Sequence, residues 1–149
     1  MIKRFSAVLV LGALFAGSLA VAPSHAAKHT NAAMSMSVML GAQAFSGVTG
    51  TATLSYAAGM TTVKVTIKHV EAGSMHPAHI HAGGSCTANG AVIGALTTLK
   101  ANNAGIATST TMLKGDFTTK AAYVNVHLGP GLALTQFTVL ACGVIHSAM

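Results

Sequence analysis

Residues 75–82 read MHPAHIHA, a stretch in which histidines alternate with apolar side chains. Successive side chains of a β-strand point to opposite faces of the sheet. If residues 78–82 form a strand, His79 and His81 point to one face and Ile80 points into a core. The stretch therefore predicts a half-buried strand that carries two imidazoles side by side.

The same two-residue alternation recurs along the chain between turns rich in Gly, Asn and Ser. The expected strands cover residues 38–45, 48–56, 61–70, 77–82, 91–99, 106–113, 122–128 and 135–145. After residue 27 the sequence has no sustained apolar stripe of 3.6-residue period. Many short strands at this spacing predict an antiparallel sandwich or barrel.

The N-terminus has the three parts of a secretory signal peptide: a basic start, an apolar run over residues 5–22 and a small-residue end. Ser24 and Ala26 fit positions −3 and −1 of a cleavage site before Ala27. We therefore expect a secreted or periplasmic protein, with no membrane span after cleavage. An uncleaved membrane anchor is the alternative.

The expected organisation has three parts. Residues 1–26 form the signal peptide, residues 27–37 a flexible lead-in, and residues 38–149 one β-domain. The chain after residue 26 is long enough for one domain with a hydrophobic core and too short for two.

The charged side chains exclude several functions. Glu71 and Asp116 are the only acids, and Arg4 is the only arginine. The sequence therefore has too few carboxylates for the paired acids of a glycosidase. It also has too few for an all-oxygen calcium or magnesium site. The net charge is +6, but the lysines are scattered and aromatics are few, so we expect no nucleic-acid partner.

Cys86 and Cys142 are the only cysteines. In an exported protein such a pair usually forms a disulfide. In the chain-entropy model a crosslink over so long a loop stabilises the fold by roughly 4 kcal/mol. The alternative is two free thiols that bind a soft metal.

A third histidine can join the first two. In the expected strand at 122–128, Val124, Val126 and Leu128 share the inward parity, so His127 points outward with its neighbours Tyr123 and Asn125. A third imidazole from a neighbouring strand would complete a three-nitrogen metal site. Imidazole and the scarcity of carboxylates favour copper, with zinc less favoured. The alternative is a set of histidines on a solvated strand face.

Further ligands are candidates. His76 precedes Pro77 at the entrance to the strand and is the natural fourth ligand; a solvent-exposed loop histidine is the alternative. His69 shares the inward parity of its strand and is expected to be packed at the strand end. Thioether sulfur suits Cu(I), although methionine also fills gaps in cores. The methionines concerned are Met34, Met36, Met39 and Met75.

Cleavage after Ala26 would create a second possible copper site. The new N-terminus would read Ala27-Lys28-His29. A free amine, two deprotonated amides and a third-position imidazole form the square-planar nitrogen site that Cu(II) and Ni(II) prefer.

These motifs resemble two known families. AHIHAG at 78–83 and YVNVH at 123–127 resemble the CHRD (chordin-type) domain, and LACGVI at 140–145 resembles the close of Cu/Zn superoxide dismutases. The resemblance implies an eight-stranded antiparallel Greek-key β-sandwich with one disulfide. It also implies copper ligands at His79, His81 and His127.

The departures from the dismutase pattern concern its zinc site and its substrate. No histidine lies between Cys86 and Asp116, where the zinc ligands would fall, and Val139 occupies the position of the substrate-steering arginine. Without a local cation, both steering and docking of the superoxide anion are lost.

The expected function is therefore an exported protein that binds or buffers copper through three histidines. Two alternatives stay open. One is a copper-only, superoxide dismutase-like oxidoreductase, so the sequence leaves open whether the protein is an enzyme. The other is a non-metal extracellular structural or adhesion module.

Overall fold

The computed structural model describes residues 34–130 and 137–145, which form eight β-strands. The strands are β1 (Met34–Ala42), β2 (Thr49–Ala57), β3 (Met60–Lys68), β4 (Met75–Ala82), β5 (Val92–Ala101), β6 (Ile106–Lys114), β7 (Ala122–His127) and β8 (Val139–Ile145). Strands β2 to β7 begin and end within two residues of the expected ranges. No helix in this part of the chain is long and apolar enough to cross a membrane.

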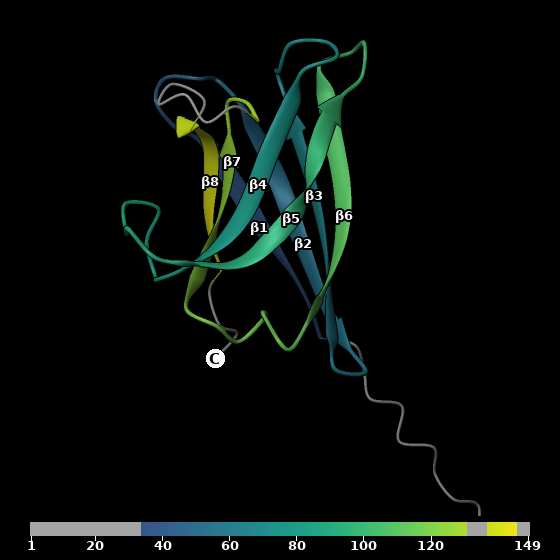
Figure 1. Cartoon of the computed structure of the whole chain (residues 1–149), viewed down its shortest axis with the longest axis vertical. Coiled ribbons are helices and arrows are strands. Elements are labelled where there is room, and N and C mark those ends of the chain that lie inside the picture. The colour runs from purple at the N-terminus through teal and green to yellow at the C-terminus, as the bar shows by residue number, and fades with distance from the viewer. Residues whose placement is uncertain (1–33, 131–136, 146–149) are drawn as a thin grey trace, which may run out of the picture. The chain divides into compact units, whose positions relative to one another are not determined.

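The strands close into a barrel in the order β1-β2-β3-β6-β5-β4-β7-β8 (Figure 1). All neighbouring strands are antiparallel. The connections from β3 to β4 and from β6 to β7 each pass over two strands, which is the Greek-key pattern. The predicted all-β, eight-stranded antiparallel Greek-key fold is confirmed.

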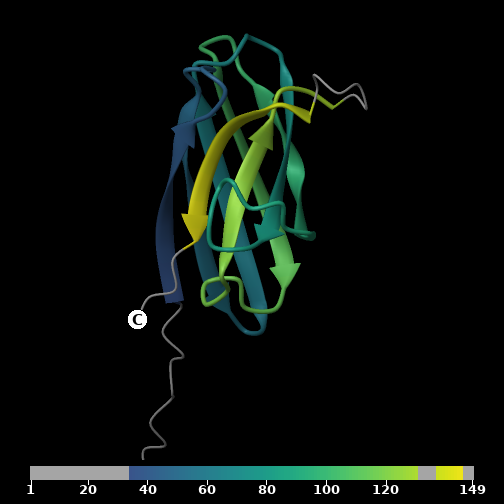
Figure 2. The same ribbon diagram turned by 90° about the vertical axis from the view of Figure 1, so that its left-hand side faces the viewer.

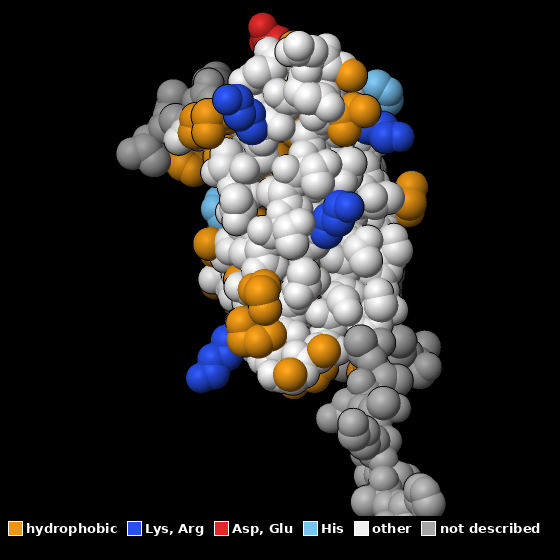
Figure 3. Space-filling view, turned by 90° about the vertical axis from the view of Figure 1, so that its right-hand side faces the viewer, with side chains coloured by type: hydrophobic (Ala, Val, Ile, Leu, Met, Phe, Trp, Pro, Cys, Tyr) orange, Lys and Arg blue, Asp and Glu red, His pale blue; other side chains and the backbone are white. Residues whose placement is uncertain are grey.

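The hydrophobic core follows the predicted alternation. On β3, Val63, Val65 and Ile67 are buried, whereas Lys64 and Lys68 between and after them are exposed. Burying apolar surface contributes about 25 cal/mol per Å² and is the main force that closes the barrel. On the face seen in Figure 3, the lysines stand apart from one another.

The first strand begins earlier than expected. Residues 34–37 were expected in the flexible lead-in, but they pair with residues 53–56 of β2 as part of β1. Met36 continues the inward parity of Val38 and Leu40 and packs against the core. Met34 and Met39 are exposed. At the other end of the domain, residues 137 and 138 precede β8 rather than belonging to it.

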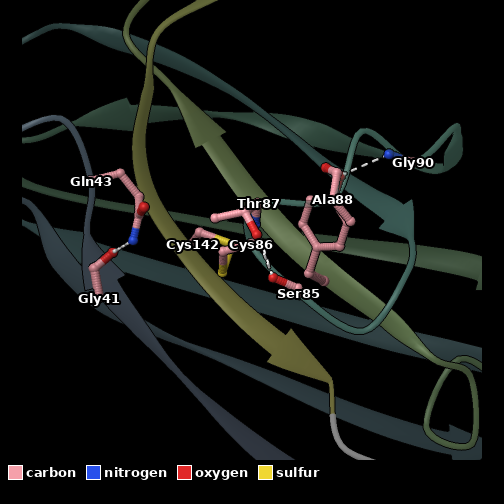
Figure 4. The surroundings of a disulfide bond; sticks show 9 residues. Gly41, Gln43, Ser85, Cys86, Thr87, Ala88, Gly90 and Cys142 are labelled. Atoms are coloured by element: carbon pink, nitrogen blue, oxygen red, sulfur yellow. Dashed lines mark hydrogen bonds between the residues drawn. A yellow bond between two sulfur atoms is a disulfide. The ribbon is translucent and has the colours of Figure 1, made fainter.

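The expected disulfide is confirmed. Cys86 and Cys142 form an S–S bond, so neither thiol is free to bind a metal. The bond ties the β4–β5 connection to β8, and the amide of Gly83 in the same connection donates to the carbonyl oxygen of Ala121. The connection therefore lies over β7 and β8 (Figure 2; Figure 4 shows the disulfide with Ser85, Thr87 and Ala88 of this connection). Strand β7 is buried on both faces along its whole length.

His69 is not the packed residue that its parity predicts. Strand β3 ends at Lys68, and His69 takes a left-handed backbone conformation with φ of 67°. The chain turns there, so the side chain is exposed and its Nδ1 lies 3.2 Å from the carbonyl oxygen of Gly47.

Candidate metal centre

Three histidines meet on the outer face of β4 and β7. One ring nitrogen from each of His79, His81 and His127 lies within 4.8 Å of the others. On the opposite face of β4, Ala78 and Ile80 are fully buried in the core. The prediction that His79 and His81 share the face opposite to Ile80 is therefore confirmed.

Strand pairing explains why residues far apart in sequence meet. Strands β4 and β7 are neighbours, with His79 opposite Asn125 and His81 opposite Tyr123. The ring centroid of His127 lies 5.4 Å from that of His79 and 6.4 Å from that of His81. The imidazoles thus converge from two neighbouring strands, and this arrangement is the one that the sequence predicted.

The end of β7 is irregular at His127. The register with β8 shifts between Val126 and His127, and the strand ends there. Val124 and Val126 point inward as expected, but Leu128 is 41% exposed. The inward parity predicted for Leu128 is wrong because it lies beyond the end of the strand.

Two of the imidazoles are oriented by main-chain carbonyls. Nδ1 of His81 lies 2.9 Å from the carbonyl oxygen of Gly90, and Nδ1 of His127 lies 2.9 Å from that of Phe137. A carbonyl oxygen only accepts hydrogen bonds, so each Nδ1 carries the hydrogen and each neutral ring keeps a lone pair on Nε2.

The free lone pair of His81 is buried. Its Nε2 atom is shielded from solvent and has no hydrogen-bond partner among the described residues. A buried polar atom without a partner costs about 1–3 kcal/mol. Histidine ligands of metals commonly donate their other N–H to a carbonyl in this way. The donor set therefore fits a metal ion that takes imidazole nitrogen.

The charge state of His79 also suits a ligand. Burial lowers the pKa of His79 below its ordinary value, and the neighbouring His127 and His81 lower it further. At neutral pH the ring is therefore uncharged, which is the form that binds a metal.

His76 lies elsewhere. It is 2% exposed and shares the parity of Ala78 and Ile80, on the opposite face of β4 from His79. Its Nδ1 lies 3.0 Å from the carbonyl oxygen of His127, and its Nε2 lies 2.7 Å from Oγ of Ser74. The structure therefore does not bring His76 into the three-histidine group, and the alternative of an exposed loop histidine is wrong as well.

Several groups around the site were not expected from the sequence. The carbonyls of Gly90 and Phe137 orient the rings of His81 and His127, yet a carbonyl leaves no signal in side-chain patterns. Tyr123 was expected only as an outward neighbour of His127, but its ring stacks on His81 with centroids 5.2 Å apart. The possible N-terminal copper motif, Ala27-Lys28-His29, lies outside the described residues.

The comparisons with known proteins bear on the fold. A scan against models of known protein families finds no match, and no curated protein sequence matches the chain. Among solved structures, the Cu/Zn superoxide dismutase from Brucella abortus is similar, with a TM-score of 0.57 and 22% sequence identity. The similarity covers 76% of this chain and 100% of that chain. It shows a superoxide dismutase-like fold.

The expected resemblance to the CHRD domain is not supported, because no family model matches the chain. Its motifs, AHIH at 78–81 and YVNVH at 123–127, are explained by local structure. Both are alternating strand sequences, and β4 and β7 pair directly. Two adjacent strands that turn one face to the core and carry histidines on the other need such alternation whatever their family.

Proposed function

We propose that this protein binds copper through His79, His81 and His127 and holds the ion for storage, buffering or transfer. The observation that carries the proposal is the convergence of three ring nitrogens within 4.8 Å. The buried Nε2 of His81, which has no hydrogen-bond partner among the described residues, supports it. A bound metal ion would take up that lone pair.

The choice of copper rests on the chemistry of the donors. The three groups are imidazoles, and neither of the chain's two acids, Glu71 and Asp116, belongs to the group. Calcium, magnesium and manganese favour carboxylate or carbonyl oxygen, whereas copper and zinc bind imidazole well. Copper binds such sites more tightly than zinc in the usual order of divalent metals. Bound copper would supply a centre that can exchange one electron.

The chain's own residues give the site its rigidity. The carbonyls of Gly90 and Phe137 hold the rings of His81 and His127 with Nε2 free. Burial keeps His79 uncharged at neutral pH. Ligands that are ordered before binding lose little conformational entropy when the ion arrives.

Location outside the cytoplasm is part of the proposal. The disulfide between Cys86 and Cys142 suits an oxidising compartment, such as the extracellular space or the periplasm. The signal peptide expected at residues 1–26 supports the same location. Mass spectrometry of the protein recovered from the culture medium or periplasm tests the expected start at Ala27.

We do not extend the proposal to superoxide dismutation. Val139 occupies the position where the dismutase resemblance expects a steering arginine, and Arg4 is the chain's only arginine. An enzyme that attracts a small anion benefits from a positive charge near its site. A fold similar to that of a dismutase does not by itself supply this positive charge.

Copper titration against a competing chelator tests the site. We expect His79→Ala and His127→Ala each to weaken copper binding by at least about 100-fold, because each removes one of three ligands. His69→Ala is the matched control, since His69 is exposed and lies outside the group. Equal affinity in all four proteins would reject the proposal.

A further inference from the structure

We infer that Tyr123 is a positioning residue for the metal centre. It selects which nitrogen of His81 faces the metal. The inference rests on the proposed function. Tyr123 contacts His81 directly through its ring and indirectly through its hydroxyl group. None of the proposed ligands is a tyrosine, so the role is distinct from ligation.

The first contact is ring stacking. His81 and Tyr123 are directly opposite each other on β4 and β7. Their ring centroids are 5.2 Å apart and their planes are inclined by only 13°. Tyr123 is 2% exposed, so its own ring is held by its surroundings. The stack therefore fixes the plane in which the imidazole of His81 can lie.

The second contact runs through the hydroxyl group. The Tyr123 hydroxyl donates a hydrogen bond to the carbonyl oxygen of Ala88 and accepts one from the amide of Gly90, 3.2 Å away. The carbonyl oxygen of the same Gly90 accepts the hydrogen on Nδ1 of His81. One phenol oxygen thus holds the residue that fixes the tautomer of His81.

The position of Gly90 depends on close contact with β4. A Cβ atom at Gly90 would lie 1.6 Å from the carbonyl oxygen of Ala82, so only glycine fits there. The amide of Ala82 also donates to the carbonyl oxygen of Ala91 at 2.9 Å. The turn around Gly90 is therefore held from two sides, by the edge of β4 and by the Tyr123 hydroxyl.

The hydroxyl of Tyr123 works by geometry rather than by proton transfer. It donates to a carbonyl oxygen, which is a poor base and does not take the proton. Its effect on the metal is to keep the hydrogen of His81 on Nδ1 and the lone pair on Nε2. Outer partners of metal ligands of this kind typically change metal affinity by about 10–100-fold when they are removed.

The test compares Tyr123→Phe with Tyr56→Phe. The first variant keeps the ring that stacks on His81 and removes only the oxygen. The second changes the chain's other tyrosine, which lies on β2 away from the three-histidine group. Nitrogen-15 NMR of the histidine rings reports the tautomer in the metal-free protein, and competition titration reports copper affinity.

We expect Tyr123→Phe to give a mixture of tautomers at His81 and to weaken copper binding about tenfold. His127 should keep its tautomer, because its partner is Phe137. Tyr56→Phe should change neither quantity. A Tyr123→Phe protein that only melts at a lower temperature, with the His81 tautomer and the copper affinity unchanged, would show a purely structural role and overturn the inference.

The two proposals can fail separately. If the wild-type protein does not bind copper, the proposed function fails, but the NMR measurement on the metal-free protein still tests the tautomer control by Tyr123. If Tyr123→Phe does not fold, the wild-type spectrum decides: His81 with its hydrogen on Nε2 contradicts the inference, and a single Nδ1–H form supports it.

Discussion

The Nδ1 atom of His76 lies 3.0 Å from the carbonyl oxygen of His127, although 51 residues separate them in sequence. The contact joins the start of β4 to the end of β7, where the register with β8 shifts. His76 thus supports the backbone of a proposed ligand, while its own ring lies on the other face of β4. Ser74 completes the arrangement at the second ring nitrogen.

This contact predicts a double effect of His76→Ala. The substitution leaves the buried carbonyl oxygen of His127 without this partner. The half-buried hydroxyl of Ser74 loses one of its two partners and keeps the carbonyl oxygen of Glu71. We expect the free energy of unfolding to fall by about 1–3 kcal/mol, measured by urea denaturation of the metal-free protein. We also expect copper affinity to fall, but less than in His127→Ala, because the three ligands remain. Full copper affinity and full stability in His76→Ala would contradict this role.

We expect removal of the disulfide to lower the stability of the protein. A double substitution, Cys86→Ser with Cys142→Ser, should lower the free energy of unfolding by about 2–5 kcal/mol. Because the bond holds the β4–β5 connection that contains Gly90, copper binding should also weaken. Comparison of the variant with wild-type protein under reducing conditions checks that both effects come from the same bond. If the reduced wild type and the variant differ in stability, part of the loss comes from the serines.

We expect the substitution Ser109→Ala to stabilise the protein. The hydroxyl of Ser109 is buried opposite Val65 and has no hydrogen-bond partner among the described residues. Ser109→Ala removes that group, and we expect the free energy of unfolding to rise by about 1 kcal/mol.

Thr61 is the matched control for Ser109. It is also buried, but its Oγ1 donates to the carbonyl oxygen of Gly115 and accepts from the amide of Phe117. Thr61→Ala should therefore destabilise the protein by about 1–3 kcal/mol. The two alanine variants should move the urea midpoint in opposite directions, and a shift in the same direction would refute the distinction.

The depressed pKa of His79 predicts a pH dependence. An unfolded histidine titrates near 6.5, whereas folded His79 binds its proton only at lower pH. Between these two pH values the unfolded chain binds more protons, so the stability of the metal-free protein should fall as pH drops below about 6.5. Denaturation curves at a series of pH values should show a smaller dependence in His79→Gln. An identical pH dependence in both proteins would assign the effect to other groups.

Much of the fold follows from local alternation. Because a strand presents every second side chain to the core, the sequence around Ile80 shows which face is buried and places His79 and His81 together. The same rule places His127 outward and locates most strands. The disulfide could also be predicted, because the sequence contains only two cysteines.

The site depends on contacts that alternation does not encode. The pairing of β4 with β7 brings His127 to the other two histidines, and it arises only when the Greek-key barrel closes. The partners of His81 and His127 are main-chain carbonyls, which every residue has, so no side-chain pattern identifies them. His76 shows the same limit. Its residue type and position suggested a fourth ligand, but it is buried on the inner parity of β4, where its Nδ1 contacts the carbonyl oxygen of His127.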